Sequence, residues 1–216
     1  MTYLECVNQV LKRLRENQVT TVDQTTYSAL ISSFVNDAKR EIEDAHQWSS
    51  LRETLTFPTV VSQLTYSLTG CDQESTIIKE VIDDTNNNYL LQATERYLND
   101  SLYIGSGTTG NPQYYIYSGT DASGNLQVDL YPKPSGIFQI RIDLVKSTAD
   151  LTSDSSILRV PGNCVRDLAV AYALSERGES GGLTSSEARF KADQALANAI
   201  SIDANRYGKE LVFEAV

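Results

Sequence analysis

Residues 51–58 read LRETLTFP, and the hydrophobic side chains in this stretch are spaced differently from those that precede it. Leu51, Leu55 and Phe57 are separated by polar residues in the manner of a half-buried β-strand. Pro58 cannot donate a ladder hydrogen bond, so it ends this strand or confines it to a sheet edge. Upstream of Leu51 the hydrophobic residues recur at helical spacing. The stretch therefore marks the change from helix to β structure.

Two amphipathic helices are predicted before this point. Hydrophobic residues at helical spacing in residues 2–16 lie opposite a basic face, and a longer helical pattern starts at Tyr27 and ends just before Trp48. The polar face of the second helix carries two pairs of opposite charge spaced four residues apart, Lys39 with Glu43 and Arg40 with Asp44. Such pairs stabilise a solvent-exposed helix by about 0.2–0.5 kcal/mol each. We expect the two helices to form an antiparallel hairpin.

Short strands are predicted after Leu51, and turn-rich segments separate them. The candidate strands after the first are residues 64–68, 77–82, 89–92, 114–117, 126–131 and 138–145. Six or seven short strands favour a sandwich or a barrel. A short helix is expected between Thr94 and Leu102, with Thr94 as its cap.

The helical pattern returns at Pro161. Val165, Leu168, Ala169 and Tyr172 form one face of a helix that Gly178 would stop, and Ala173 allows a neighbour to approach closely. Residues 184–187, TSSE, form a capping box for a last helix that runs to Gly208. The hydrophobic stripe of this last helix is Ala188, Ala192, Ala195, Leu196, Ala199 and Ile202. The apolar tail 211–216 is too short to fold alone, so it packs on something or is mobile.

These patterns predict an α+β fold. The N- and C-terminal helix pairs form one helical bundle, and the middle of the chain forms an antiparallel β-sandwich or a barrel-like region. The expected parts are an N-terminal helix pair in 1–50, a β domain in 51–156, a C-terminal helix pair in 157–208 and a docking tail in 209–216.

Composition narrows the class of protein. The 216 residues are 41% hydrophobic and carry a net charge of −10, which argues against a protein that grips nucleic acid through its phosphates. The acidic excess lies in residues 51–156, with 13 acidic and 6 basic side chains. No membrane span or signal peptide is recognisable, so we expect a cytoplasmic origin. Cys6, Cys71 and Cys164 fit no metal or redox spacing and are expected to be buried free thiols.

No catalytic constellation stands out. Residues 105–110, GSGTTG, match GxGxxG, but a strand-like segment follows them where dinucleotide binding needs a helix. His46 is the only histidine, which leaves little material for a catalytic triad or a metal site. Asp83 and Asp84 are adjacent and point in different directions, so they are a poor pair of hydrolase carboxylates. We expect no enzyme activity, cofactor or metal.

Tyrosine is in excess, with 12 tyrosines against 5 phenylalanines. Several are crowded into the β region, namely Tyr103, Tyr114, Tyr115, Tyr117 and Tyr131. They either cover the faces of the sheet or form an interface, because tyrosine is common at both. Sugar binding on such a face is a further possibility.

The order of these features resembles a family of phage proteins. The segments that carry the resemblance are 34–43 with Trp48, 111–117, 130–134, 158–161 and 168–174. Together they are similar to the head-to-tail adaptor, also called connector or tail tubular protein A, of T7-like short-tailed bacteriophages. The resemblance spans nearly the whole chain and rests on the order of the segments.

The resemblance implies a structural virion protein at the head–tail junction, made in the cytoplasm of a bacterial host. About twelve copies would form a ring under the portal, extend the channel for passing double-stranded DNA and offer a platform to the tail nozzle. We expect the portal or subunit interface to involve Leu211, Val212, Phe213, Ala169 and Ala173. The expected nozzle-facing loop contains Gly105, Gly107, Gly110 and Asn111.

Two alternatives remain open at this level. The first is a β-rich tail or capsid accessory module that binds carbohydrate or another virion protein without forming a ring. The second is a tail-associated hydrolase, which turnover assays on glycans or peptides would reveal.

Overall fold

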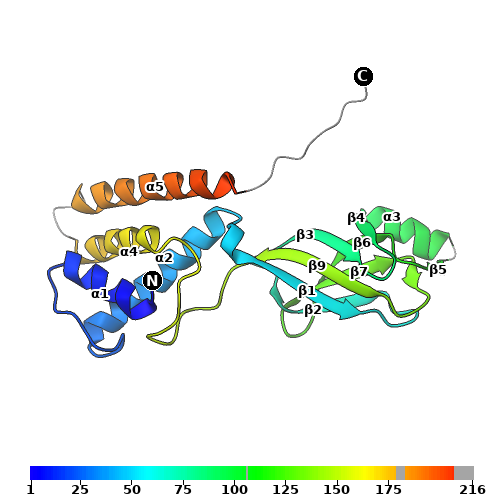
Figure 1. Ribbon diagram of the computed structural model, residues 1–216, viewed down its shortest axis with the longest axis horizontal. Coiled ribbons are helices and arrows are strands. Elements are labelled where there is room, and N and C mark those ends of the chain that lie inside the picture. Colours follow the sequence, from blue (N-terminus) through cyan, green and yellow to red (C-terminus); the bar gives the residue numbers. More distant parts are fainter. Residues whose placement is uncertain (106, 179–182, 207–216) are drawn as a thin grey trace, which may run out of the picture. The chain divides into compact units, whose positions relative to one another are not determined.

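A computed structural model of the chain describes residues 1–105, 107–178 and 183–206, and it divides into two compact units (Figure 1). The helical unit consists of residues 1–51 and 147–216, and the β domain is the continuous segment 52–146. The first boundary lies one residue from the predicted one. The second lies ten residues before the predicted residue 156, because the segment after Lys146 bonds to the helices.

Four long helices make up the described part of the helical unit. They are α1 (Tyr3–Arg13), α2 (Thr26–Ala45), α4 (Gly162–Arg177) and α5 (Leu183–Ala204), with a short 3₁₀ turn η1 (Ser49–Leu51) after α2. Thr2 caps α1 by accepting from the Glu5 amide, and Gly178, at φ +62°, ends α4 as predicted. The described part of α5 begins at Leu183. Thr184, which we had predicted to cap this helix from outside, therefore lies within it. Gly208, its predicted end, lies outside the described residues.

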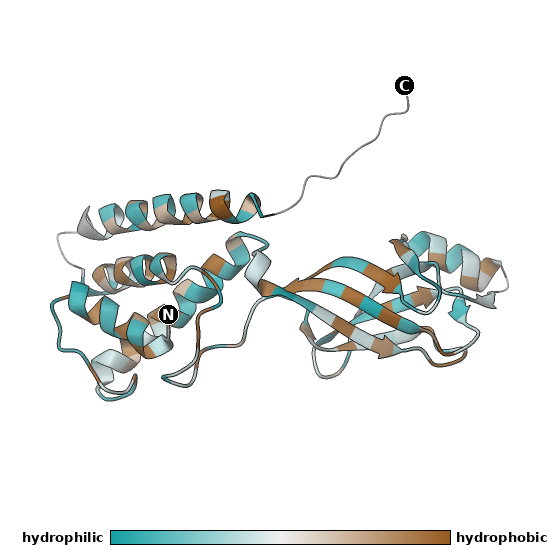
Figure 2. Ribbon diagram, in the orientation of Figure 1, coloured by the Kyte–Doolittle hydropathy of each residue, from teal (hydrophilic) through white to brown (hydrophobic). Residues whose placement is uncertain are grey.

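Helix α4 lies at the centre of this unit and contacts α1, α2 and α5. Its small residues Ala169 and Ala173 have no exposed surface, which allows the neighbouring helices to approach closely. Helix α5 runs alongside α4 (Figure 1), and Ala192 is its only buried hydrophobic residue among those described. Figure 2 shows hydrophobic and hydrophilic residues mixed along α5. Ile202, predicted to face the helix neighbours, is 62% exposed.

Buried charges fix the segment that follows the β domain. Lys39 and Glu43 were predicted to lie in solvent, but their side chains are 1% and 0% exposed and 3.2 Å apart. Both bind Thr148: the Lys39 ammonium donates to its carbonyl at 2.6 Å, and Glu43 accepts from its amide and hydroxyl at 3.0 and 2.7 Å. Arg40 pairs with Asp150 at 2.8 Å, where Asp44 was predicted. The prediction was wrong because the partner segment lies more than 100 residues away in the chain.

The β domain is built on one seven-stranded sheet in the order β1-β9-β3-β4-β6-β7-β2. Its strands are β1 (Arg52–Pro58), β2 (Thr65–Asp72), β3 (Thr76–Asp83), β4 (Asn88–Gln92), β6 (Tyr114–Thr120), β7 (Asn125–Tyr131) and β9 (Gln139–Lys146). These seven correspond to the seven predicted strands. The pairs are antiparallel except β4 with β6, which run parallel. Two-residue strands β5 (Thr109–Gly110) and β8 (Lys133–Pro134) form a separate parallel pair.

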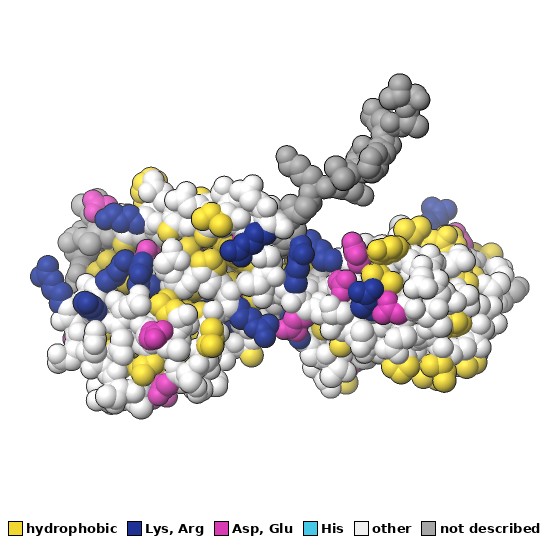
Figure 3. All heavy atoms as spheres, viewed as in Figure 1, with side chains coloured by type: hydrophobic (Ala, Val, Ile, Leu, Met, Phe, Trp, Pro, Cys, Tyr) yellow, Lys and Arg dark blue, Asp and Glu magenta, His cyan; other side chains and the backbone are white. Residues whose placement is uncertain are grey.

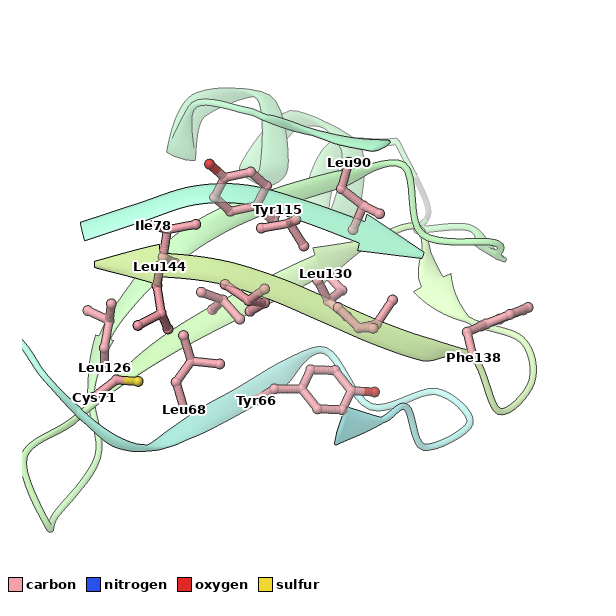
Figure 4. Packing of buried hydrophobic residues seen from close by; sticks show 14 residues of the cluster. Tyr66, Leu68, Cys71, Ile78, Leu90, Tyr115, Leu126, Leu130, Phe138 and Leu144 are labelled. Carbon is pink, nitrogen blue, oxygen red and sulfur yellow. The ribbon is translucent and has the colours of Figure 1, made fainter. Parts of the chain in front are cut away.

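The sheet curls around one hydrophobic interior, which makes the domain barrel-like (Figure 4). All seven strands contribute, with Leu68, Val128, Leu130, Ile140 and Ile142 fully enclosed. The edge strands of the sheet are β1 and β2. Phe57 on β1 and Tyr66 on β2 stack with 5.2 Å between their ring centroids, so aromatic side chains connect the two edges of the sheet. The predicted α+β class with a barrel-like middle is confirmed.

A short helix covers part of the outer face of the sheet. Helix α3 (Glu95–Asn99) is capped by the Thr94 hydroxyl, as predicted, and continues into a single π-helical turn, η2 (Asp100–Ile104). Leu98 of α3 packs with Ile116 and Tyr131 in a small second cluster. The helix is therefore anchored on β6 and β7 by apolar contacts.

Candidate functional site

Three loops at one end of the barrel are joined by hydrogen bonds. We call residues 59–64, 107–113 and 132–138 the end loops; they lie opposite the end at which the chain enters the domain at Arg52 and leaves at Lys146. The Thr59 hydroxyl donates to the Gly136 carbonyl at 3.0 Å and accepts from the Phe138 amide at 2.8 Å. The Ser62 amide donates to Pro134 at 2.8 Å, and Ser135 donates to Gly110 at 3.0 Å. The end loops therefore form one connected surface.

This surface is apolar and almost uncharged. Val60 and Val61 are each 55% exposed and Ile137 is 74% exposed, and Figure 3 shows hydrophobic side chains gathered over the domain at this end. Lys133 is the only charged residue in the three loops. Exposed apolar patches of this kind mark contacts with other proteins more often than contacts with nucleic acid, which need positive charge.

Our sequence reasoning missed the apolar residues of the end loops. Pro58 was interpreted only as the end of a strand, and the segment between the predicted strands 126–131 and 138–145 only as a turn. The usable signal was a β-branched residue inside a turn, as at Val60, Val61 and Ile137, because turns normally carry small polar side chains.

The predicted glycine loop is only partly in this surface. Gly110 lies in β5, Asn111 is exposed, and Gly107 adopts φ +49° while its amide donates to Ser101 at 3.1 Å. Gly105 closes the π-helical turn through a 2.8 Å bond from its amide to Asp100. The GxGxxG match ends inside β5 and is followed by β6, so its last glycine opens no helix and the match has no dinucleotide-binding geometry.

The tyrosines of the β domain mainly cover the sheet. Tyr97 of α3 packs against Tyr114 and Tyr131, with ring centroids 5.0 and 6.2 Å away. Tyr115 points into the barrel interior. The Tyr103 side chain lies outside the part of the chain that the structure describes. Tyr89 and Leu91 of β4 remain more than 60% exposed, so a second, smaller apolar area borders α3.

The paired carboxylates considered as hydrolase groups have structural partners. Asp83 is fully buried and accepts from the Thr85 and Asn86 amides at 3.0 and 3.2 Å, so it closes the turn between β3 and β4. Asp84 forms an ion pair with Arg141 at 3.1 Å. Neither group faces a cleft with the other.

His46, Ser49 and Asp203 meet in the helical unit without forming a triad. The Ser49 hydroxyl donates directly to the Asp203 carboxylate at 2.6 Å, and His46 lies 3.3 Å from the other oxygen. In a triad the histidine stands between the serine and the acid, so that it can take the serine proton. Here the carboxylate stands between them. Partial burial acts to raise the pKa of Asp203, but the hydrogen bonds from Ser49 outweigh it and hold the pKa below its usual value.

These contacts fasten the last helix at both ends. Asp203 ties the end of α5 to Ser49, while Arg189 near its start pairs with Glu41 of α2, which also accepts from the Tyr172 hydroxyl. Burial, together with the bond to Glu41, raises the pKa of Tyr172 to about 12.

The predicted portal or subunit residues fall into two groups. Ala169 and Ala173 are fully enclosed among the helices of their own chain, so they support a surface only by packing behind it. Leu211, Val212 and Phe213 lie outside the described residues.

The cysteine thiols are the remaining candidate reactive groups. The thiols of Cys6, Cys71 and Cys164 are free and buried, as predicted, and burial raises their pKa values, that of Cys6 to about 12. Within the described ranges, no group of three or more metal-ligating side chains comes together. In the same ranges, none of the helices combines the length and apolar character that a bilayer crossing requires.

Comparison with known proteins assigns the chain to a family. No curated protein matches it. Residues 1–210 match the SU10 adaptor protein family, which covers the β domain and nearly all of the helical unit. The adaptor part of the resemblance seen in the sequence is thereby confirmed. The chain belongs to the SU10 adaptor protein family, a family of structural adaptor proteins of bacteriophages.

Proposed function

We propose that about twelve copies of this chain form a ring beneath the portal of a T7-like short-tailed phage, extend the DNA channel and carry the tail nozzle. The observation that supports this most is the adaptor family match over residues 1–210. The protein would act at the head–tail junction of the virion after synthesis in the host cytoplasm. Its role would be to provide binding surfaces for neighbouring copies, the portal and the nozzle.

The charge of the chain suits a channel through which DNA slides. The net charge is −10, and the acidic excess lies in residues 51–156. Like charges on protein and phosphate oppose adhesion, so double-stranded DNA would pass without sequence-specific binding.

The end loops are the proposed nozzle contact. They offer an apolar, connected surface with Val60, Val61 and Ile137 exposed, and they include Gly107, Gly110 and Asn111 of the predicted loop. Shortening the loop around Gly107 is expected to block nozzle attachment and leave portal binding unchanged. Pull-down with the nozzle protein and, separately, with the portal would measure both. Loss of portal binding together with nozzle binding would contradict this division of surfaces.

The C-terminal segment is the proposed portal contact. Leu211, Val212 and Phe213 would dock on the portal, while Ala169 and Ala173 hold the helices behind that contact together. Deleting residues 209–216 is expected to weaken portal binding while circular dichroism and the unfolding midpoint stay the same. Unchanged affinity for the portal would contradict this assignment.

The experiment that tests the whole proposal is the mass and negative-stain appearance of the purified chain, alone and mixed with its portal ring. A ring, or a portal lengthened by a symmetric collar, is the expected result. A persistent monomer that ignores the portal would overturn it and favour the accessory module, for which the apolar area at Tyr89 and Leu91 would be the first surface to test.

A further inference from the structure

A groove of about 470 Å³ runs along the last turns of α5 in the helical unit. One wall is formed by α5 from Ala195 to Asp203 and by Arg206 just after the helix, and the other contains Trp48, Val160 and Pro161. Its volume is within the range of pockets that hold small ligands or peptide side chains. Ile202 lines it and is 62% exposed, so an apolar side chain stands open to solvent inside a partly apolar groove.

We infer that this groove binds residues 207–216 of the same chain before the protein meets its assembly partners. The described chain ends at Arg206, which is itself a lining residue, so residues 207–216 are joined to the chain at the groove. This inference goes beyond the proposed function, because it concerns the free protein and requires neither a ring nor a portal.

The segment is long enough to cover the groove. The α5 wall from Ala195 to Asp203 covers eight steps of 1.5 Å, or about 12 Å, and Arg206 extends it beyond the helix. Residues 211–216 span at most about 20 Å when extended. Residues 207–210 remain to reverse the direction of the chain, and they include Gly208, the residue type that most readily adopts turn conformations.

The chemistry of the groove and of the segment also agrees. Residues 211–213 are Leu-Val-Phe, which match a wall of Ile202, Val160 and Pro161. The charged lining residues are Arg159, Arg206 and Asp203, and Asp203 is already bonded to Ser49 and Arg206. The segment carries two acids, Glu210 and Glu214, and one base, Lys209. The three charged lining residues thus sum to +1 and the charged residues of the segment sum to −1.

Binding in the groove would shield the apolar residues of the tail in the free chain. Exposed apolar segments cause aggregation at the concentrations of protein synthesis. A partner that takes the tail must then compete with the groove.

Limited chymotrypsin digestion of the full chain tests the inference. Ile202→Glu places a charge in the groove, while Phe190→Glu makes the same change at an equally exposed position, 62%, that does not line it. Cleavage within residues 207–216 tracks the population of the undocked tail, so Ile202→Glu is expected to raise its rate about tenfold or more, and Phe190→Glu to leave it unchanged. Equal cleavage of the wild type and Ile202→Glu would overturn the inference.

Disulfide cross-linking distinguishes the same chain from a second copy. Val212→Cys combined with Asn198→Cys, a lining residue, is expected to form an intramolecular bond under mild oxidation. Ala197→Cys with Val212→Cys is the control, because Ala197 lies at the same level of α5 but outside the groove. The native cysteines are buried with raised pKa values and react slowly. Cross-linked dimers, or equal yields from both pairs, would contradict binding within one chain.

Discussion

Both units bury charged side chains, but they use them over different distances along the chain. In the helical unit, Glu43 binds Thr148 and Asp203 binds Ser49, partners separated by 105 and 154 residues. In the β domain, the fully buried Asp83 binds Thr85 and Asn86 within its own turn. The buried Asp129 of β7 accepts from the Thr65 hydroxyl of β2, 64 residues away. Buried charge thus joins the two ends of the chain in one unit, whereas in the other it acts inside a single segment, within a turn or between neighbouring strands.

This difference shows which unit depends on long-range closure. The helical unit is assembled from residues 1–51 and 147–216, so its helices pack only after a long intervening segment has been spanned. The β domain is a single segment with its own hydrophobic interior. A domain with its own core can fold alone.

The largest expected effect follows from this contrast. Residues 52–146 produced alone are expected to fold, whereas residues 1–51 alone are expected to remain unfolded, because α1 and α2 lose α4 and Thr148. Circular dichroism and NMR amide dispersion would measure both fragments. A disordered 52–146 fragment would contradict the conclusion that the β domain folds without the helical unit.

The next effect concerns the buried pair. Glu43→Ala leaves Lys39 as a buried charge without its carboxylate, so the free energy of unfolding is expected to fall by about 3–5 kcal/mol. Urea unfolding monitored by the fluorescence of Trp48, the only tryptophan, would measure it. The exposed pair offers the control, since Arg40→Ala is expected to change little.

A double variant sharpens this prediction. Lys39→Met with Glu43→Leu removes both charges, so it is expected to lose less stability than Glu43→Ala alone. A larger loss in the double variant would show that the contact with Thr148, rather than the unpaired charge, dominates.

A smaller effect is expected in the β domain. Asp83→Ala removes a fully buried carboxylate that accepts from two turn amides, and it is expected to cost about 1–3 kcal/mol. Asp121 caps the exposed turn between β6 and β7 in the same manner, through the amides of Ser123 and Asn125 at 2.8 and 2.9 Å. Asp121→Ala is expected to cost less, because water can replace its carboxylate. Equal midpoints for the two variants in thermal unfolding would be inconsistent with burial as the cause.

The smallest effect depends on pH. The pKa of Asp203 is held below its usual value, so its carboxylate stabilises the fold above the ordinary Asp pKa of about 3.9, and this contribution disappears as pH falls through the lowered pKa. Asp203→Asn is expected to unfold at lower urea than the wild type at pH 7, with the gap closing in acid. A gap that is constant between pH 7 and pH 3 would contradict the assignment.

Sequence patterns predicted the elements well. The seven strands of the main sheet, the Thr94 cap of α3 and the Gly178 stop were all readable, because strand alternation, capping hydroxyls and glycine at positive φ are local signals. The buried free cysteines followed from the usual preference of that residue type.

The misplaced residues depend on distant partners. Lys39 and Glu43 have the spacing of a solvent-exposed helical pair. The segment around Thr148 covers this face of α2, and nothing in the helix sequence indicates that contact. Ile202 continues a hydrophobic stripe in sequence, but the only long helix that α5 extensively contacts is α4, so the stripe is incompletely covered. Val60 and Ile137 were recognisable as β-branched residues in turns, but the bonds that join residues 59–64 to 132–138 into one surface have no sequence signature.

The pairing of β1 with β9 has a consequence for how the two ends of the chain find each other. Arg52 lies opposite Val145, so a folded β domain holds its entrance and exit about one strand spacing apart. To the helices, the segment 52–146 then behaves like a tight turn. Loop-closure entropy grows with the logarithm of length, so folding of the β domain first would spare the helical unit about 3 kcal/mol. An insertion of almost any length could occupy this place, provided that its two ends are paired.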